Sequence, residues 1–303
     1  MKKIFAILTS VALVFTLVLG LCSCACNAEK NITVVVREDS SGTKEAFDKA
    51  VSKNGVTLQG NVTADAIIHN KTGLVLSAVA SDENAIGYIS LGSLNDTVNA
   101  VKVNGVLPSS ETVLDGSYKI QRPFVIMTSE KVPLTLRTED FLNYLKSAAS
   151  KEHSEAAGTI FLEDGAKRAN EGSEPIDVLD YQKQSSLPNG AKIVIRGSTS
   201  MEKFINSAAK GYAQLYGENV EDIFDIELQG SSIGRSAVEN DATGNVIGLS
   251  SASVDEEGIE SFNVCLDAVA VIVNKSNTTI QDLTVEQLYD IFAGNIKKLS
   301  ELE

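Results

Sequence analysis

Three short candidate strands are each followed by a turn rich in serine and glycine and then by apolar residues at helical spacing. These runs lie at 32–36, 193–195 and 226–228. The run at 32–36 is β-branched throughout, which is typical of strands in parallel sheets whose two faces are covered by helices. Because strands and helices alternate along the chain, the sequence predicts an α/β fold.

Other segments extend this pattern. Strands are expected at 85–91 and 268–273, and helices at 141–146 and 284–292. In contrast, residues 150–189 are polar, acidic and without a clear period. We expect a linker or an irregular excursion there.

The N-terminus has the layout of a secretory signal peptide. Lys2 and Lys3 precede an apolar run over 4–21, which ends among small residues and cysteines. A membrane-spanning helix is the alternative, but the run is at the short end of the length that a span requires. We therefore predict a signal peptide over residues 1–23 and export of the chain.

Three cysteines follow the apolar run within five residues, which is unlike the spread spacing of a disulfide framework. The segment 21–24 resembles the bacterial lipobox, in which a small residue precedes a cysteine that becomes lipidated. Cys24 is the predicted lipidation site, with Cys22 and Cys26 as alternatives. Several acyl chains hold a protein firmly to a membrane, so we expect an extracytoplasmic protein anchored to the cell membrane.

The formal net charge of −14 limits the partners of this chain. Nucleic acids and anionic membrane surfaces are bound through clustered Lys and Arg, so neither is expected. A small anion is not excluded, because salt screens distant surface charge beyond about 10 Å while local donors act at contact.

The turns after the three strands suit an oxyanion. The first N–H groups of a helix are unpaired, and Ser and Thr hydroxyls add donors without bulk. Each turn alone is also an ordinary helix cap, as in the capping box that Thr199 and Glu202 are predicted to form. Arg37 strengthens the anion hypothesis because it follows a buried strand, although Glu38 and Asp39 are alternative partners for it.

These residues resemble the periplasmic phosphate-binding protein family, the receptors of phosphate ABC importers. Arg37 with residues 40–43 resembles the arginine and Ser-Gly-Thr loop of the family, and residues 193–201 resemble its first phosphate loop. Residues 229–234 and 248–251 resemble the second loop and the third ligand strand. The resemblance implies a two-lobe periplasmic-binding-protein-like (type II) fold with the ligand cleft between the lobes.

The order of the two halves departs from the family. There the Gly-Ser-Thr-Ser half comes first, whereas here the Arg37 half leads, so the sequence looks circularly permuted. The resemblance then implies one lobe over 30–117 and a second over 118–303, joined by one crossing. Either the free ends lie near the hinge, or lobes pair between chains.

The resemblance also implies a ligand set and a function. The expected function is capture of inorganic phosphate for an ABC importer, with the permease subunits as partners and no cofactor. Many family members have an aspartate at the position of Ser251, which accepts a hydrogen bond from the proton of hydrogen phosphate. Because this chain has a serine there, sulfate remains an alternative ligand. Asp39 could supply the missing acceptor. The expected anion-binding residues are Arg37, Ser41, Gly42, Thr43, Thr199, Ser200, Ser231 and Ser251.

Two other hypotheses remain from the sequence. Residues 230–234 fit the G-x-S-x-G motif of a serine hydrolase with Ser232 as nucleophile, but His69 and His153 both precede that serine, against the order of that fold. A surface protein or sensor with an altered or lost anion site is the second. Two isolated histidines give no metal-ligand spacing, so no metal is expected.

Overall fold

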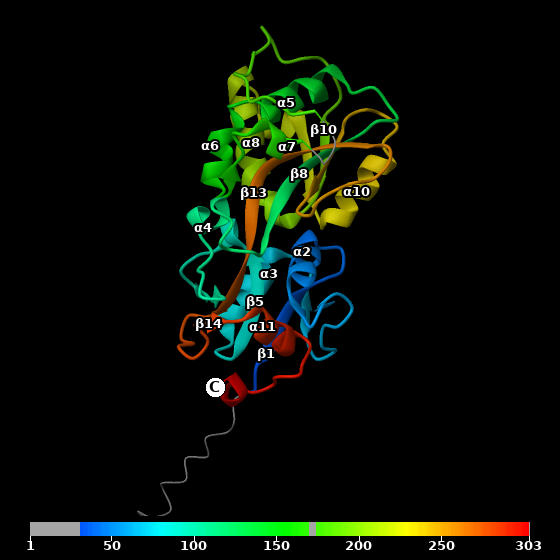
Figure 1. Cartoon of the computed structure of the whole chain (residues 1–303). Helices are drawn as coiled ribbons and strands as arrows, with labels where there is room; N and C mark the ends of the chain where they lie inside the picture. Colours follow the sequence, from blue (N-terminus) through cyan, green and yellow to red (C-terminus); the bar gives the residue numbers. More distant parts are fainter. Residues whose placement is uncertain (1–30, 170–173, 303) are drawn as a thin grey trace, which may run out of the picture.

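The computed structural model describes residues 31–169 and 174–302 and has two lobes (Figure 1). The predicted signal peptide over 1–23 and the candidate lipidation site Cys24 lie outside the described residues. Both lobes are α/β, as expected. A single twisted sheet runs through both lobes in the strand order β11-β10-β12-β8-β13-β5-β1-β4.

The first lobe is built around β1 (Thr33–Arg37), which lies between β4 (Ile67–His69) and β5 (Ala85–Ser90) and is parallel to both. Its β-branched residues are buried because helices α2 (Gly42–Ala50) and α3 (Thr72–Ser81) pack against the sheet. The remaining elements of this lobe before the first crossing are β2 (Ser52–Lys53), β3 (Val56–Thr57), η1 (Leu91–Ser93), β6 (Val98–Ala100), β7 (Lys102–Val103) and α4 (Ser110–Leu114).

The second lobe repeats this arrangement. Strand β10 (Ile193–Gly197) lies between β11 (Phe224–Leu228) and β12 (Val246–Ser250), again parallel to both. Strand β8 (Gln121–Ser129) pairs with β12 in the antiparallel sense. The helices of this lobe are α5 (Leu136–Lys146), α6 (Ser150–Ala156), α7 (Gly165–Arg168), η2 (Thr199–Met201), α8 (Glu202–Tyr216), α9 (Val220–Ile223) and α10 (Ser231–Glu239).

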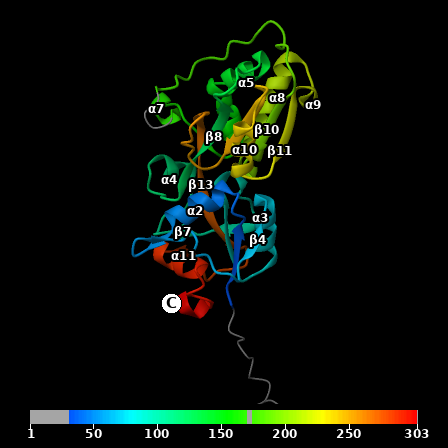
Figure 2. The ribbon, with the colours of Figure 1, turned by 90° about the vertical axis from the view of Figure 1, so that its right-hand side faces the viewer.

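The long strand β13 (Ile259–Asn274) corrects the predicted domain boundaries. It pairs with β8 of the second lobe as far as Ala268 and with β5 of the first lobe from Val269 onward. The residues that follow are β14 (Asp282–Leu283), α11 (Val285–Phe292) and η3 (Leu299–Leu302), and they lie with the first lobe (Figure 2).

Packing explains why the C-terminal part belongs to the first lobe. The ring of Phe292 on α11 meets that of Phe47 on α2 edge-on at 4.8 Å between centroids, inside one apolar cluster. The expected second lobe over 118–303 is therefore too long. The chain crosses between lobes twice, near residue 120 and within β13, and not once.

The described chain ends lie side by side, but not near the hinge. The backbone N–H of Ile32 donates to the carbonyl oxygen of Lys297 at 2.8 Å. This contact lies at the end of the first lobe away from the second lobe (Figure 1).

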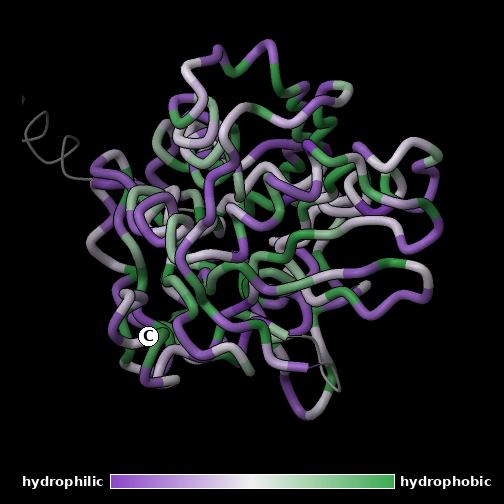
Figure 3. The backbone as a smooth tube through the Cα atoms, turned by 90° about the horizontal axis from the view of Figure 1, so that it is seen from above, coloured by the Kyte–Doolittle hydropathy of each residue, from purple (hydrophilic) through white to green (hydrophobic). Residues whose placement is uncertain are grey.

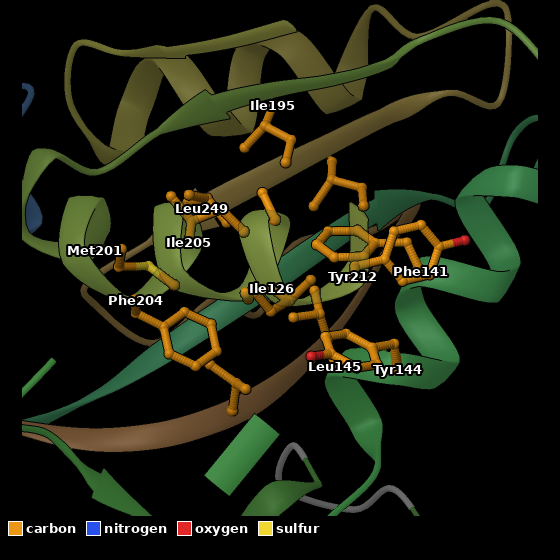
Figure 4. Close-up of a cluster of buried hydrophobic side chains, with 14 of the residues drawn as sticks. Ile126, Phe141, Tyr144, Leu145, Ile195, Met201, Phe204, Ile205, Tyr212 and Leu249 are labelled. Atoms are coloured by element: carbon orange, nitrogen blue, oxygen red, sulfur yellow. The ribbon is translucent and has the colours of Figure 1, made fainter. Parts of the chain in front are cut away.

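The core of the second lobe fixes β10 and α8 relative to each other. Phe204, Ile205 and Tyr212 of α8 are fully buried against Ile195 of β10 and Phe141 of α5 (Figure 4). The hydrophilic stretches lie largely in the outer loops (Figure 3). A rigid core of this kind holds the turn that joins β10 to α8 in place.

The polar segment predicted over 150–189 is partly regular. It contains α6, β9 (Ile160–Phe161) and α7, and becomes irregular from residue 174 onward. Tyr181 ties the irregular residues to helix α5, because its hydroxyl donates a hydrogen bond to the Asp140 carboxylate at 2.7 Å. Tyr212 and Tyr216 donate to the same carboxylate oxygen.

Within residues 31–169 and 174–302, no helix has the length and apolar character that a membrane crossing requires. The same described ranges contain no group of three or more His, Cys, Asp or Glu side chains arranged to hold a metal ion.

Candidate anion-binding site

The carboxyl ends of parallel strands from both lobes point into the cleft between them. Strand β1 ends at Arg37 and leads into α2, and β4 leads into α3. From the second lobe, β10, β11 and β12 lead into the turns that carry Ser198, Ser231 and Ser251. Open α/β sheets place their ligands outside the carboxyl ends of parallel strands, so this is the expected position of a binding site.

Hydroxyl groups from the two lobes meet in this cleft. The Thr43 hydroxyl of the first lobe lies 2.8 Å from that of Ser200 of the second. The Ser198 hydroxyl donates to that of Ser251 at 2.8 Å, and Ser231 lies 3.4 Å from Ser251. All five residues are buried, and we call them the hydroxyl cluster.

Glycines allow the two lobes to approach this closely. A Cβ atom on Gly42 would lie 2.5 Å from the Ser231 hydroxyl and 2.8 Å from that of Ser251. A Cβ atom on Gly230 would lie 2.6 Å from the Ser40 hydroxyl, and Gly230 has a φ of +129°, which L side chains rarely adopt. Both positions therefore require glycine for the lobes to meet.

Arg37 brings positive charge to the site and is only 2% exposed. Its guanidinium donates to both carboxylate oxygens of Glu38, at 2.8 and 3.0 Å, and its Nη1 donates to the Thr72 hydroxyl at 3.1 Å. The same carboxylate accepts the Ser40 hydroxyl at 3.0 Å. Glu38 thus holds the guanidinium beside the loop that carries Ser41, Gly42 and Thr43.

Asp39 does not act as the suggested acceptor. Its side chain is 99% exposed, and its nearest charged partner is Lys44 at 3.6 Å. Of the two alternative carboxylates, Glu38 pairs with Arg37, because residue 38 faces the guanidinium and residue 39 faces solvent.

Ser41 has a structural role in addition to its predicted one. Its hydroxyl oxygen accepts the N–H groups of Thr43 and Lys44 and so caps α2. The hydroxyl proton is still available to donate, since the oxygen uses its lone pairs for the cap. The cap also aims the first turn of α2, with its positive helix end, at the hydroxyl cluster.

A buried ion pair in the two crossing strands holds Ser251 in position. Arg122 of β8 bonds the Asp267 carboxylate of β13 at 2.9 Å and donates to the carbonyl oxygen of Ser251 at 3.2 Å. Burial raises the pKa of Asp267 and lowers the pKa of Arg122, so each charged form depends on its partner.

Thr72 is a site residue that the sequence analysis missed. Its hydroxyl lies 3.1 Å from Nη1 of Arg37 and 3.2 Å from the Thr199 hydroxyl, so it joins the charged group of one lobe to the first loop of the other. The signal was present in the sequence, because a short β-branched run at 67–68 leads through a polar turn into the apolar helix α3.

An ion pair closes the cleft beside the cluster. Arg235 of α10 in the second lobe donates to Glu45 of α2 in the first lobe at 2.9 Å and to Glu256 at 3.2 Å. Burial favours a raised pKa for Glu45, but hydrogen bonds from Lys49 and Arg235 outweigh it and the pKa is lowered. The carboxylate is therefore stabilised in its charged form while the lobes are together.

The geometry around Ser232 does not resemble a catalytic triad. Ser232 is exposed on α10, and its backbone N–H donates to the Ser40 carbonyl at 3.2 Å. His153 is engaged elsewhere, with its ring nitrogens 2.6 Å from the Tyr144 hydroxyl and 2.9 Å from that of Ser207. His69 lies on β4, whose register pairs it with Arg37.

The eight residues expected to bind the anion lie at the facing surfaces of the two lobes, and they supply charge, hydroxyls and a helix N-terminus. Serine and threonine hydroxyls both donate and accept, so the contacts that they now make across the cleft can be exchanged for contacts to an oxyanion. A guanidinium adds charge-assisted hydrogen bonds to such a ligand.

Comparison with known proteins gives consistent matches over most of the chain. The model of the PBP superfamily domain matches residues 25–149 and 182–301. It leaves residues 150–181 unmatched, which are most of the polar segment over 150–189 that the resemblance had also left unmatched.

Curated relatives match nearly end to end. Phosphate-binding protein PstS 2 of Streptococcus pneumoniae is 34% identical over 275 residues, which cover 89% of this chain and 87% of the relative. The protein of the same name from Streptococcus agalactiae is 33% identical over 285 residues, covering 91% and 89%.

A solved structure supports the same relationship. The crystal structure of a phosphate-binding protein of a phosphate ABC transporter from Streptococcus pneumoniae matches with a TM-score of 0.65 at 32% sequence identity. The match covers 90% of this chain and 100% of that one.

Proposed function

This chain belongs to the PBP superfamily and, within it, to the family of phosphate-binding proteins, and from that premise we propose that it captures inorganic phosphate for an ABC importer. The observation that carries the proposal is the convergence of Arg37 and the hydroxyl cluster on one cleft between two lobes. A tetrahedral oxyanion needs many donors from several directions, and two facing lobes supply them.

The anion-binding residues of this proposal are the eight expected from the sequence together with Thr72. Arg37 supplies charge, and Ser41, Thr43, Thr199, Ser200, Ser231 and Ser251 supply hydroxyl groups. Gly42 supplies close approach, since any side chain there would collide with Ser231 and Ser251. The protein acts by binding and lobe closure, without a catalytic step or a cofactor.

Phosphate is favoured over sulfate in this proposal because the Ser251 hydroxyl can accept a hydrogen bond as well as donate one. Hydrogen phosphate carries a proton that needs an acceptor, whereas sulfate carries none. The Ser251 hydroxyl oxygen accepts a hydrogen bond from the Ser198 hydroxyl at 2.8 Å, so it already acts as an acceptor in the site.

Isothermal titration of the protein, stripped of bound anion by partial unfolding and refolding, tests the proposal. We expect one-to-one phosphate binding, and sulfate binding weaker by about tenfold, the effect of one unmatched hydrogen bond. Absence of binding by both anions would overturn the transport function. Tighter binding of sulfate would keep the site and replace the ligand.

The export signal and lipid anchor belong to the same proposal. Cys24 is the proposed acylation site, and the membrane permease subunits of the importer are the proposed partners. Acylation of the full-length chain is measured by incorporation of labelled palmitate in a bacterial host. Loss of label in Cys24→Ala, but not in Cys22→Ala or Cys26→Ala, is the expected result.

A circular permutation relative to other members of the family is a further part of the proposal; the two PstS 2 relatives share the order of this chain, because each matches it nearly end to end in a single alignment. The permutation is supported by the contact between Ile32 and Lys297, because adjacent ends are the condition under which permutation leaves a fold intact. A variant that joins residue 302 to residue 31 through a short linker and opens the chain between Asn189 and Gly190 should fold. Its phosphate affinity should stay within about threefold of the parent. An unfolded product would contradict the proposed permutation.

A further inference from the structure

The two crossings between the lobes lie next to each other, at the start of β8 and within β13, and a buried ion pair lies beside them (Figure 1). Arg122 on β8 is opposite Asp267 on β13 in the antiparallel register. After Ala268, β13 leaves β8 and pairs with β5 from Val269 onward. The ion pair therefore lies where the polypeptide passes from one lobe to the other.

The guanidinium of Arg122 has a further partner in the anion site. Its Nε and Nη2 donate to Oδ2 of Asp267 at 3.2 and 2.9 Å, and its Nη1 donates to the carbonyl oxygen of Ser251 at 3.2 Å. Ser251 is the first residue after β12, past the last register pair that this strand makes with β8. A side chain at the crossing therefore holds this carbonyl group where the strand has ended.

The backbone of Ser251 is fixed on both sides. Its N–H donates to the Ser231 hydroxyl at 3.1 Å, and its carbonyl oxygen accepts from Arg122. The first lobe packs against the same residue, because a Cβ atom on Gly42 would lie 3.0 Å from the carbonyl carbon of Ser251. The position from which the Ser251 hydroxyl reaches into the cleft is thus set by contacts to its backbone.

Stability alone does not account for this ion pair. Arg122 is 3% exposed and Asp267 is 1% exposed. Removing two charges from water costs about as much free energy as their attraction returns, and well-packed apolar residues are often equally stable in their place. The donation from Arg122 to a residue of the anion site indicates a role in binding.

We propose that Arg122 and Asp267 are positioning residues that set the preference of the site for phosphate over sulfate, acting through Ser251 and without touching the anion. In the proposed function the Ser251 oxygen accepts the proton of hydrogen phosphate, and a hydrogen bond forms only at the correct distance and angle. Sulfate has no proton and does not depend on this acceptor. The inference rests on the proposed phosphate site and names residues that tune its specificity.

Replacing both partners together tests the role without leaving a buried charge unpaired. Arg122→Met with Asp267→Leu removes both charges and fills the space with apolar side chains, which buried ion pairs commonly tolerate. Arg196→Ala with Asp225→Ala is the matched control. It also removes an ion pair between neighbouring strands, in this case on the outer strands β10 and β11 of the same sheet.

Isothermal titration with phosphate and with sulfate measures the effect. In the Arg122→Met, Asp267→Leu variant we expect phosphate affinity to fall by about tenfold and sulfate affinity to change by less than about twofold, so that the preference is lost. The control variant should bind both anions as the wild type does.

Urea unfolding shows whether each variant is folded. Arg122→Lys is the second variant, and it decides the question if the double replacement does not fold. It keeps a positive charge beside Asp267 but lacks the planar guanidinium that bonds the carboxylate and the Ser251 carbonyl together. It should lose part of the preference for phosphate.

An effect through Ser251 differs from a general loosening of the site. Added to Ser251→Ala, the double replacement should weaken phosphate binding no further, because the hydroxyl that it positions is already absent. Added to Ser200→Ala, whose hydroxyl bonds Thr43 of the first lobe, it should multiply the loss by about tenfold.

The outcomes separate this inference from the proposed function. If the folded variants keep the wild-type ratio of phosphate to sulfate affinity, the inference is overturned and the phosphate site stands. The same conclusion follows if the double replacement multiplies the loss of Ser251→Ala. If the wild type does not bind phosphate at all, both proposals fail.

Discussion

The first lobe brings a buried charge to the anion site, whereas the second lobe brings mainly hydroxyl groups. Arg37 lies in the first lobe and is held there by Glu38, its neighbour in sequence. The second lobe contributes Ser198, Ser200, Ser231 and Ser251, whose hydroxyls bond one another or reach across the cleft. Neither lobe alone surrounds an anion, so binding and lobe closure depend on each other.

The difference between the lobes predicts unequal contributions to affinity. Every hydrogen bond to the anion has one charged partner and contributes about 1.5–3 kcal/mol, but the Arg37 guanidinium adds its own positive charge and several N–H donors, whereas a serine hydroxyl adds one neutral donor. Single substitutions in the first lobe at Arg37 should therefore have larger effects than single hydroxyl deletions in the second.

Arg37→Ala should cause the largest loss, about 100-fold in phosphate affinity by titration calorimetry, because it removes the charge and leaves Glu38 unpaired beside the ligand. A double variant that also carries Glu38→Ala should remain weak, which separates the lost charge from the exposed carboxylate. Arg196→Ala is the control, since Arg196 pairs with Asp225 away from the cleft. An Arg37→Ala protein with wild-type affinity would contradict the asymmetry between the lobes.

Ser231→Ala and Ser251→Ala should each weaken phosphate binding by about tenfold, as expected when one neutral donor to the charged ligand is lost. Both side chains are fully buried in the hydroxyl cluster. Ser236→Ala on the exposed face of α10 serves as the matched control and should leave the affinity unchanged. A loss as large as that of Arg37→Ala would show that the hydroxyls of the second lobe are as important as the charge.

Arg235→Ala should weaken phosphate binding by about threefold, since the pair with Glu45 joins the lobes and partly exposed ion pairs contribute at most about 1 kcal/mol. The same loss is expected for Glu45→Gln, with little further change in the double variant. High salt should reduce the difference from wild type, because salt screens exposed charges. Additive losses in the double variant would contradict a direct contribution of the pair to closure.

The smallest effect concerns stability of the second lobe and not binding. Burial lowers the pKa of His153 from its usual 6.5, against the opposing charge of Glu152. The unfolded chain then takes up the proton more readily than the folded one. Stability is therefore retained above pH 6.5 and falls as the pH drops through the pKa of the folded-state histidine.

Urea unfolding at a series of pH values from 7.5 to about 5 measures this contribution. The free energy of unfolding of the wild type should fall more steeply with acidification than that of His153→Gln, which has no titrating ring. Equal slopes would contradict the buried neutral state of His153. Phosphate affinity at neutral pH should be unchanged in this variant, because His153 lies in the second-lobe core and not at the cleft.

Much of the site could be predicted from the sequence because its residues belong to short local sequence patterns. A β-branched run that enters a Ser/Gly turn and then a helix specifies strand, turn and helix within about fifteen residues, and parallel sheets place such turns at one edge. The strand runs at 32–36, 193–195 and 226–228 all appear as strands, and their turns lie in the cleft. Arg37 could be predicted as a candidate anion-binding residue because it lies at the end of the first of these strands.

Other features depended on contacts that the local pattern does not encode. The predicted capping box of Thr199 and Glu202 is replaced by Ser198, whose hydroxyl accepts the N–H of Ser200, and Thr199 instead contacts Thr72 of the other lobe. The pairing of Arg37 with Glu38 and the exposure of Asp39 were likewise decided by which face of the turn packs against the lobe.

The sequence by itself determined the α/β class, the donor-rich turns and the residue types that an oxyanion requires, because these follow from hydrogen bonding and hydrophobic period over short stretches. The tertiary structure alone decided that residues 269–302 return to the first lobe and that Thr72 joins Arg37 to Thr199. These features arise from packing between segments that can lie more than two hundred residues apart, as Phe47 and Phe292 do, and no local pattern specifies which of them will meet.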